Sequence, residues 1–346
     1  MIDMKAMVLT DWEKLELQDA PVPELHEDEA LIKVRYAGIC GSDVHIFTGH
    51  HPTAKAPVIM GHEFIGTVEK INSQKSLKFN VGDRVVVEPL ISCGFCEACN
   101  TGNWHVCKNL KLLGIHTNGA FAEYVKVAVN KIIPVAEHLS DKIAALTEPF
   151  AVGFHVNQRA ELKNGDTALV IGGGPIGLIV GMVAKISGAS QVVFSEINED
   201  RLKQIEEFGF TALNPAKENA LERAKTLTEN EGFDVVFEVS GSQAGILFAT
   251  QACKIRGKIV PVGFPGKRPE FEVLQVIFKE TTVIGSRVYS FQHFKNTVKM
   301  LENIVENQTF DVEKLIGGVY PLAQLEKGIL MMKEGKNIGK LLIECA

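Results

Sequence analysis

The sequence predicts an α/β protein in which a β-rich part carries an inserted domain built on a doubly wound parallel sheet. Up to about residue 150, short β-branched runs such as EALIKVRYAG and FIGTVEKI are separated by Gly, Pro and Asp, which is typical of strands joined by turns. From about residue 160, continuous apolar runs such as TALVIGG and QVVFSEI alternate with helical segments such as NEDRLKQIEEFG. That alternation is typical of a parallel sheet covered by helices on both faces.

The alternation stops near Gly285. The tail contains two helical stretches, FKNTVKMLENIVEN and AQLEKGILMMKEG, and a final strand, KLLIEC. We expect this tail to return to the β-rich part. A chain of 346 residues is long enough for two domains with cores of their own. The predicted domains are residues 1–150 with 293–346, and residues 151–292.

Composition and charge exclude several classes of protein. The net charge of −6 argues against a nucleic-acid binder, which needs a basic face. The first residues carry charges every few positions and lack the apolar stretch of a signal peptide. Seven cysteines, four of them clustered, fit a reducing compartment, so we expect a cytoplasmic protein. We expect no membrane span, because glycines and Pro175 interrupt the longest apolar run.

A glycine-rich turn follows the predicted strand TALVI. The segment Gly172–Gly177 contains the spacing G-x-G-x-x-G and leads into a helix. The spacing alone is weak, but its position between a buried strand and a helix is typical of a dinucleotide-binding loop. Gly172 permits the tight turn, Gly174 lets the backbone approach a pyrophosphate, and Gly177 lets the helix pack on the strand. The alternative is a glycine-rich turn without a ligand.

A carboxylate ends the next predicted strand, about twenty residues further on. Glu196 can accept hydrogen bonds from both hydroxyls of a cofactor ribose and would repel a 2′-phosphate, so we expect NAD rather than NADP. Arg201 and Lys203 follow closely and could weaken that preference. The predicted cofactor-binding residues are Gly172, Gly174, Pro175, Ile176, Gly177, Glu196 and Arg201.

Four cysteines stand close together in the run SCGFCEACNTGNWHVC. Cys93, Cys96, Cys99 and Cys107 have the spacing C-x2-C-x2-C-x7-C. Four thiolates at such spacings can surround one tetrahedral Zn²⁺, as in closed structural sites. Two disulfides or four free thiols are the alternative. Free cysteines rarely gather in a loop punctuated by glycine, and a disulfide framework suits small secreted domains better than a chain of this size. A zinc held by four sulfurs would be structural.

Side chains of the kinds that ligate a catalytic zinc occur elsewhere in the chain. Cys40 follows a strand in a glycine-rich turn, His62 and Glu63 lie in GHEF, and Glu148 lies in LTEPF. Cysteine, histidine and a carboxylate bind catalytic zinc while leaving a position open. Each of these residues alone has an ordinary structural explanation, and their spacing does not by itself define a site.

The order of these motifs resembles that of a known family. The segments Cys40–His45 (CGSDVH), Gly61–Phe64 (GHEF) and Thr147–Pro149 (TEP), with the four-cysteine run and the glycine turn, are similar to zinc-dependent medium-chain dehydrogenases. The resemblance spans nearly the whole chain. It is closest to the sorbitol dehydrogenase-like, or polyol dehydrogenase, branch, which includes threonine, butanediol and sugar-acid dehydrogenases. It implies a GroES-like catalytic domain and a Rossmann cofactor domain.

The resemblance also implies two zinc sites. In it, Cys40 and His62 ligate the catalytic zinc, and Glu63 is a direct or switching third ligand. Glu148 either ligates the zinc directly or holds its water. The clustered cysteines hold the structural zinc, which many sorbitol dehydrogenase-like members have lost.

The same resemblance implies the chemistry. Ser42 hydrogen-bonds the substrate hydroxyl, His45 continues the proton path, and hydride passes to the nicotinamide in a cleft between the domains. Arg287, in KETTVIGSRVYSFQHF, matches an arginine near the substrate of sugar-alcohol and sugar-acid members.

The expected function is NAD-linked oxidation of a secondary alcohol in a polyol, sugar alcohol or sugar acid to the ketone. The chain lacks the Gly-His-Cys variant and Trp-rich tail of threonine dehydrogenases, yet a threonine or butanediol dehydrogenase remains an alternative. A catalytically inactive protein that binds NAD and zinc as a scaffold is the alternative from another class. The expected partners are a small-molecule substrate and further copies of the chain, as a tetramer or dimer.

Overall fold

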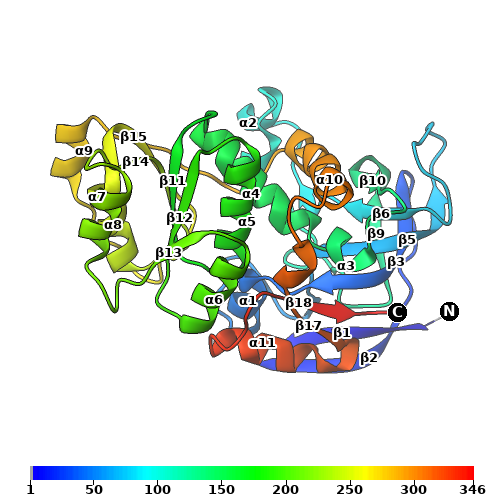
Figure 1. Cartoon of the computed structure of the whole chain (residues 1–346). Coiled ribbons are helices and arrows are strands. Elements are labelled where there is room, and N and C mark those ends of the chain that lie inside the picture. The colour runs from blue at the N-terminus through cyan, green and yellow to red at the C-terminus, as the bar shows by residue number, and fades with distance from the viewer. Residues whose placement is uncertain (1–2) are drawn as a thin grey trace. The chain divides into compact units, whose positions relative to one another are not determined.

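The chain folds into two compact units, and the prediction of an α/β protein is confirmed (Figure 1). The computed structural model describes residues 3–346. One unit comprises Met1–Glu148 and Ser290–Ala346, and the other comprises Pro149–Tyr289. The tail of the chain from Ser290 therefore belongs to the first unit.

The first unit is built on two sheets. The smaller has the order β2-β1-β4 and the larger the order β10-β6-β5-β3-β18-β17, with β9 also paired to β3. The strands are β1 (Asp3–Asp11), β2 (Lys14–Pro21), β3 (Glu29–Gly38), β4 (Val58–Ile59), β5 (Glu63–Asn72), β6 (Arg84–Val87), β9 (Tyr124–Ala128), β10 (Ile132–Pro134), β17 (Ile316–Pro321) and β18 (Lys340–Glu344). A separate pair joins β7 (Leu90–Ile91) to β8 (Lys111–Leu112). Because β18 lies between β3 and β17, the last strand completes the sheet begun by the first hundred residues.

Helices and buried apolar side chains complete the first unit. The helices are α1 (Gly41–Phe47), α2 (Glu97–Asn100), α3 (Asp141–Ala144), α10 (Phe291–Glu306) and α11 (Leu325–Lys333), with 3-10 turns at Trp104–Val106, Val129–Lys131, Val312–Leu315 and Leu322–Gln324. Helix α1 is short, but Ile46 and Phe47 are buried in a core shared with Ile39, at the end of β3. This packing fixes the turn between β3 and α1, where Cys40 lies.

The second unit contains one parallel sheet of order β13-β12-β11-β14-β15-β16. Its strands are β11 (Thr167–Ile171), β12 (Gln191–Ser195), β13 (Thr211–Leu213), β14 (Phe233–Glu238), β15 (Cys253–Pro261) and β16 (Thr282–Val283). Its helices are α4 (Thr147–Ala160), which begins two residues before the unit, α5 (Pro175–Ile186), α6 (Glu199–Glu207), α7 (Ala220–Leu227), α8 (Gln243–Ala252) and α9 (Val273–Lys279).

The direction of the strand order reverses at β11 in this sheet. Helices α5 and α6 cover one face, and α7 and α8 cover the other (Figure 1). In such sheets ligands bind outside the carboxyl ends of the strands at the reversal point, where Gly172 follows β11. No helix within residues 3–346 has the length and apolar character needed to cross a membrane.

Candidate metal and cofactor sites

Three predicted ligands of the catalytic zinc come together in the first unit. Ligand atoms of Cys40, His62 and Glu63 all lie within 4.8 Å of one another. Cys40 follows β3, and Glu63 begins the neighbouring strand β5, where it pairs with Gly38. Pairing of β3 with β5 therefore brings together residues about twenty positions apart. A thiol, an imidazole and a carboxylate in one group, with His62 and Glu63 buried and Cys40 half-buried, fit a zinc ion.

The carboxylate of Glu63 is buried against glycine on one side and a lysine on another. A β-carbon on Gly38 would lie 2.2 Å from Oε2 of Glu63, so a larger residue at position 38 would displace the carboxylate. Lys340, the first residue of β18, places Nζ 2.7 Å from Oε1 and 2.5 Å from Oε2. Nζ also donates to the carbonyl of Ile39. Burial lowers the pKa of Lys340, but the charge of Glu63 outweighs it and raises that pKa above its usual value.

A buried aspartate lies beside the ring of His62. Nδ1 of His62 lies 3.8 Å from Oδ1 of Asp43, while Nε2 lies 3.5 Å from the hydroxyl of Ser42. Burial lowers the pKa of His62, but the charges of Asp43 and Cys40 outweigh it and hold the pKa well above its usual value. Nε2 is therefore the nitrogen that can ligate a metal, with Nδ1 turned to the carboxylate, as is common for ligating histidines.

Helix α1 presents the other predicted catalytic residues. Asp43 accepts a 2.8 Å hydrogen bond from the backbone N–H of Cys40 and so caps the helix. Ser42 and His45 stand three positions apart, so they share one face of the helix. Ser42 is half-buried beside His62, and His45 is exposed. One face of α1 therefore extends from the group of Cys40, His62 and Glu63 to the solvent-exposed side chain of His45.

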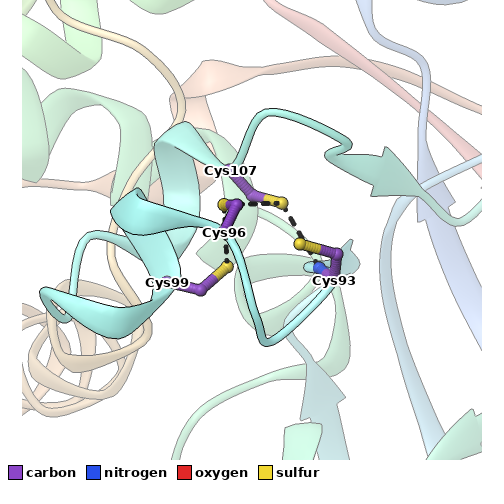
Figure 2. Close-up of side chains that lie close together, drawn as sticks. All are labelled: Cys93, Cys96, Cys99 and Cys107. Atoms are coloured by element: carbon purple, nitrogen blue, oxygen red, sulfur yellow. Dashed lines mark hydrogen bonds between the residues drawn. The ribbon is translucent and has the colours of Figure 1, made fainter.

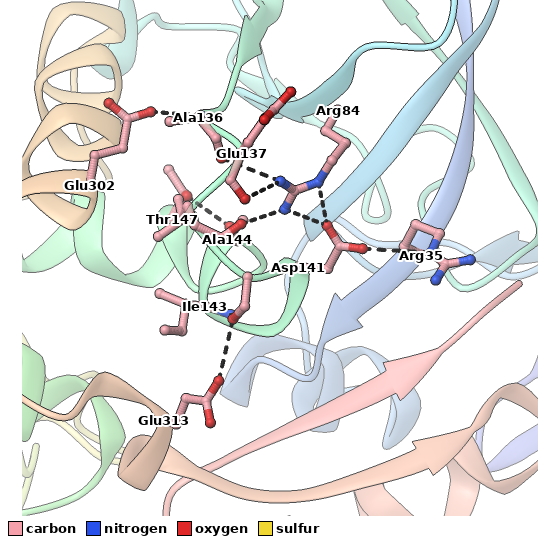
Figure 3. Close-up of polar contacts among 12 residues, drawn as sticks. Arg35, Arg84, Ala136, Glu137, Asp141, Ile143, Ala144, Thr147, Glu302 and Glu313 are labelled. Atoms are coloured by element: carbon pink, nitrogen blue, oxygen red, sulfur yellow. Dashed lines mark hydrogen bonds and ion pairs between the residues drawn. The ribbon is translucent and has the colours of Figure 1, made fainter. Parts of the chain in front are cut away.

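Glu148 is buried near the same group, at the start of α4. Its charge raises the pKa of both His62 and Lys340, although it is not among the three residues whose ligand atoms cluster. Figure 3 shows the polar contacts that hold the preceding segment. Arg84 donates to Asp141 at 2.8 Å and to the carbonyl of Leu139 at 2.5 Å. This network fixes α3 and hence the approach of the chain to Glu148.

The four clustered cysteines converge on one point in a surface lobe (Figure 2). Sγ of Cys96 lies 3.5 Å from Sγ of Cys99 and 3.8 Å from Sγ of Cys107. A tetrahedron with Zn–S bonds of about 2.3 Å has S···S edges of about 3.8 Å, whereas a disulfide needs about 2.05 Å. Backbone N–H groups lower the pKa of Cys96 to about 6, which favours the thiolate form that metals bind, whereas burial raises the pKa of Cys99 to about 11. The geometry fits zinc and excludes disulfides in this structure.

The glycine turn has the form that a pyrophosphate site requires. Gly172 has φ of +102°, and a β-carbon on Gly177 would lie 1.9 Å from the carbonyl oxygen of Gly172. Pro175 occupies the first turn of α5, where its missing N–H costs nothing. The backbone N–H groups of Ile176 and Gly177 have no intrahelical acceptor and point out of the helix start, where they suit an anion.

Glu196 follows β12, and Arg201 lies on α6 beside it. The carboxylate of Glu196 accepts a 2.8 Å hydrogen bond from the backbone N–H of Gly173. NH1 of Arg201 lies 3.9 Å from the same oxygen, Oε2. The structure therefore brings the glycine turn, Glu196 and Arg201 into one place within the second unit. Arg287 belongs to this unit too and is exposed, and its role at a substrate stays a prediction.

Two residues beside the metal group are absent from the set predicted by sequence. Asp43 offered a weak signal, as an acidic residue three positions after Cys40. For Lys340 the sequence signal was only a single charged residue before an apolar strand. Its partner, Glu63, lies 277 residues away in the sequence. A separate cavity of 1430 Å³ in the first unit is lined by residues such as Leu90, Trp104 and Val125, and Cys40 and His62 do not line it.

Comparisons with known proteins agree with this geometry. The model "Alcohol dehydrogenase GroES-like domain" matches residues 26–137, and "Zinc-binding dehydrogenase" matches residues 175–303. The chain is 34% identical over 342 residues to the sorbitol dehydrogenase of Bacillus subtilis (strain 168), covering 97% of this chain and 95% of that protein. It is 36% identical to the 2-dehydro-3-deoxy-L-galactonate 5-dehydrogenase of Pseudoalteromonas atlantica, covering 92% of each.

A solved structure shares the whole fold. A zinc-binding dehydrogenase of Sinorhizobium meliloti 1021, crystallised with NADP, superposes with a TM-score of 0.90 at 30% identity, covering 99% of this chain and 100% of that one. The family models, the full-length relatives and the shared fold agree with the resemblance seen in the motifs. The chain therefore belongs to the zinc-dependent medium-chain dehydrogenases, in their polyol dehydrogenase branch, and is an NAD(P)-dependent alcohol dehydrogenase.

Proposed function

We propose that this enzyme oxidises a secondary alcohol of a polyol or sugar acid to the ketone. The observation that carries the proposal is the buried group of Cys40, His62 and Glu63 with the hydroxyl of Ser42 3.5 Å from Nε2 of His62. Zinc bound there would act as a Lewis acid that lowers the pKa of an alcohol, and the nicotinamide would accept the hydride. Cys40 and His62 would hold the metal, with Glu63 or Glu148 completing the set.

Other residues of the chain would transfer the proton and position the metal ligands. Ser42 stands where a substrate hydroxyl meets the metal group, so it takes that hydroxyl's proton. His45, on the same face of α1 and exposed, passes the proton to solvent. The charge of Asp43, 3.8 Å from Nδ1 of His62, favours the orientation in which Nε2 is directed at the metal. Lys340 compensates the charge of Glu63, which would otherwise be an isolated buried carboxylate.

The substrate class rests on the relatives and on Arg287. The relatives named above act on a sugar alcohol and on a sugar acid, and an exposed arginine suits a carboxylate or phosphate. A screen of sugar alcohols, sugar acids, their phosphates and ethanol, with NAD⁺ and NADP⁺, tests this by formation of the reduced cofactor. We expect kcat/KM for ethanol to be lower by about 10⁴-fold, since a site built to bind hydroxyls rejects analogues that lack them.

A substitution separates neutral from charged substrates. Arg287→Ala should reduce kcat/KM for a sugar acid by about tenfold or more and leave a neutral polyol nearly unchanged, because only the acid loses a charge-assisted bond. Arg268→Ala removes the same charge from another exposed position of that unit and should change neither. Equal losses on both substrates in Arg287→Ala would remove the case for an acid. Ethanol turning over as fast as every polyol would remove the polyol proposal.

The second unit also carries a surface suited to another copy of the chain. Helix α9 has no buried residue, and β16 is an edge strand. The exposed apolar residues here are Phe264, Phe271, Val273, Leu274, Ile277, Phe278 and Val283. Seven such side chains at about 100 Å² each approach the roughly 800 Å² per partner of a standard interface. An unpaired strand edge beside them can pair with its own copy about a two-fold axis, so we propose self-association here.

The mass in solution tests this surface. Phe278→Glu with Leu274→Glu should shift the molar mass from light scattering towards a single chain of 37.9 kDa, because charges buried in an interface are costly. Val81→Glu, at an exposed apolar position of the other unit, should leave the mass of the wild type unchanged. A wild type that is already a single chain at micromolar concentration contradicts the proposal.

A further inference from the structure

A half-buried histidine, His51, lies near the candidate ligands of the catalytic zinc without being one of them. Its backbone N–H donates to the carbonyl of His45 at 3.0 Å, so the loop that follows α1 folds back on the end of that helix. Burial lowers the pKa of its ring, and the charges of His116, His45 and His62 lower it further. The ring of His51 is therefore placed beside the side chains that the proposed mechanism uses.

A turn from another part of the first unit meets this loop. The turn contains His116, whose Nε2 lies 2.9 Å from the hydroxyl oxygen of Thr53. The rings of His51 and His116 meet edge to face, with centroids 6.4 Å apart. A β-carbon on Gly114 would lie 2.4 Å from the carbonyl oxygen of Gly61, so the turn packs closely on the residue that precedes a candidate zinc ligand. Two segments that border the candidate zinc site therefore hold the histidine pair in place.

The hydrogen bonds assign the protons of both rings. Nδ1 of His51 accepts from the backbone N–H groups of Ala54 at 3.2 Å and Thr53 at 3.4 Å. Nδ1 of His116 accepts from the backbone N–H of Leu112 at 3.1 Å. In a neutral imidazole one nitrogen accepts and the other donates, so Nε2 carries the proton in both rings. Burial lowers the pKa of both histidines, which favours the neutral form near pH 7.

The Nε2–H group of His51 is left as a free donor. Within residues 3–346 the side chain of His51 makes hydrogen bonds only through Nδ1, and Nε2 is not enclosed by protein. His116 differs, because its Nε2–H donates to Thr53. A neutral N–H suits an uncharged acceptor such as an alcohol hydroxyl, whereas a carboxylate or phosphate is bound more strongly by a charged donor. The group therefore fits a hydroxyl of a substrate whose reacting carbon lies at the zinc site.

We propose that His51 is a specificity-determining residue whose Nε2–H binds the hydroxyl next to the one that is oxidised, with His116 and Thr53 as positioning residues. The inference rests on the proposed function, because it names the group that recognises a polyol. It is independent of Arg287, which belongs to the second unit. A sugar acid and a neutral polyol both carry such a neighbouring hydroxyl, so His51 serves both classes alike.

Two matched secondary alcohols test the proposal, because butane-2,3-diol carries the neighbouring hydroxyl and butan-2-ol lacks it. Their kcat/KM values are compared in the wild type, His51→Asn, His51→Gln and His50→Asn, with zinc and the better of NAD⁺ and NADP⁺ supplied. Asparagine can place its carbonyl oxygen near the position of Nδ1, and glutamine can place an N–H near the position of Nε2. His51→Asn therefore keeps the acceptor that holds the loop, and His51→Gln keeps the donor.

The ratio of the two kcat/KM values is the expected result. We expect the wild type to prefer the diol by at least about tenfold, since one hydrogen bond to the second hydroxyl is made only with the diol. His51→Asn should lower that ratio by about tenfold, and His51→Gln should keep it within about threefold. A ratio of two substrates does not depend on the fraction of active enzyme, so a partly unfolded variant leaves the test intact.

His50→Asn is the matched control. His50 is the exposed neighbour in the same loop, and its Nδ1 lies 3.0 Å from the hydroxyl oxygen of Thr48, so its replacement should leave the ratio unchanged. If His51→Asn keeps the preference for the diol, or loses activity equally on both alcohols, His51 only holds the loop and the proposal is overturned. Loss of the preference in His51→Gln overturns it too. These outcomes leave the proposed function standing, whereas a wild type that oxidises both alcohols equally well, or neither, contradicts the polyol class itself and this inference with it.

Discussion

Replacing Cys40 by serine, or His62 by alanine, is expected to reduce kcat by at least about 10³-fold, because a Lewis acid contributes several kcal/mol to the transition state. Both side chains belong to a group, within residues 3–346, that joins a thiol, an imidazole and a carboxylate whose ligand atoms lie within 4.8 Å of one another. NADH affinity should stay within about twofold of the wild type, because the glycine turn belongs to the other unit. Steady-state kinetics and NADH fluorescence titration give the two values.

His26→Ala is the control for this experiment. His26 is an exposed histidine of the same unit, so its loss should leave both kcat and cofactor binding unchanged. Bound zinc should fall by one equivalent in the Cys40 and His62 variants only. The assignment of the catalytic zinc is wrong if either variant turns over near the wild-type rate. It also fails if the zinc content stays constant while turnover is lost.

Replacing Cys99 by serine is expected to remove the structural zinc and destabilise the four-cysteine lobe. Cys99 is buried, and its Sγ lies 3.5 Å from that of Cys96. A structural zinc contributes folding free energy directly, so we expect a loss of at least about 3 kcal/mol. For a domain of 150–250 residues this lowers Tm by about 6–12 °C. Elemental analysis should give two zinc ions per wild-type chain and one per Cys99→Ser chain, with calorimetry giving Tm.

Cys253→Ala is the control for the four-cysteine site. Cys253 is buried in the second unit and lies outside both metal groups, so its replacement should leave two zinc ions in place. A wild type that holds one zinc or fewer after zinc is supplied contradicts the structural site. Retention of both ions and an unchanged Tm in Cys99→Ser would contradict it equally.

The predicted fold class and family are confirmed. They could be predicted from the sequence because the patterns that indicate them are formed by residues close together in the chain. The alternation of apolar runs with helical segments indicates a parallel sheet, and the observed order β13-β12-β11-β14-β15-β16 is that sheet. The glycine turn lies between β11 and α5, as the motif requires. The glycine turn is contained in one strand-helix-strand unit of about thirty residues, and the alternation repeats units of that length along the chain. The roles of the individual site residues stay predictions.

The sequence by itself determined which ligand types are present and which of them stand close along the chain, because turns bring neighbouring cysteines or glycines together without help from distant segments. Only the tertiary structure decided what surrounds them. Lys340 meets Glu63 because β18 pairs with β3, across 277 positions. Arg84 likewise meets Asp141, 57 positions further along the chain. The periodicity of hydrophobic residues along the chain does not predict such distant partners, because they are brought together by the packing of strands and helices. These partners determine the charge around each site.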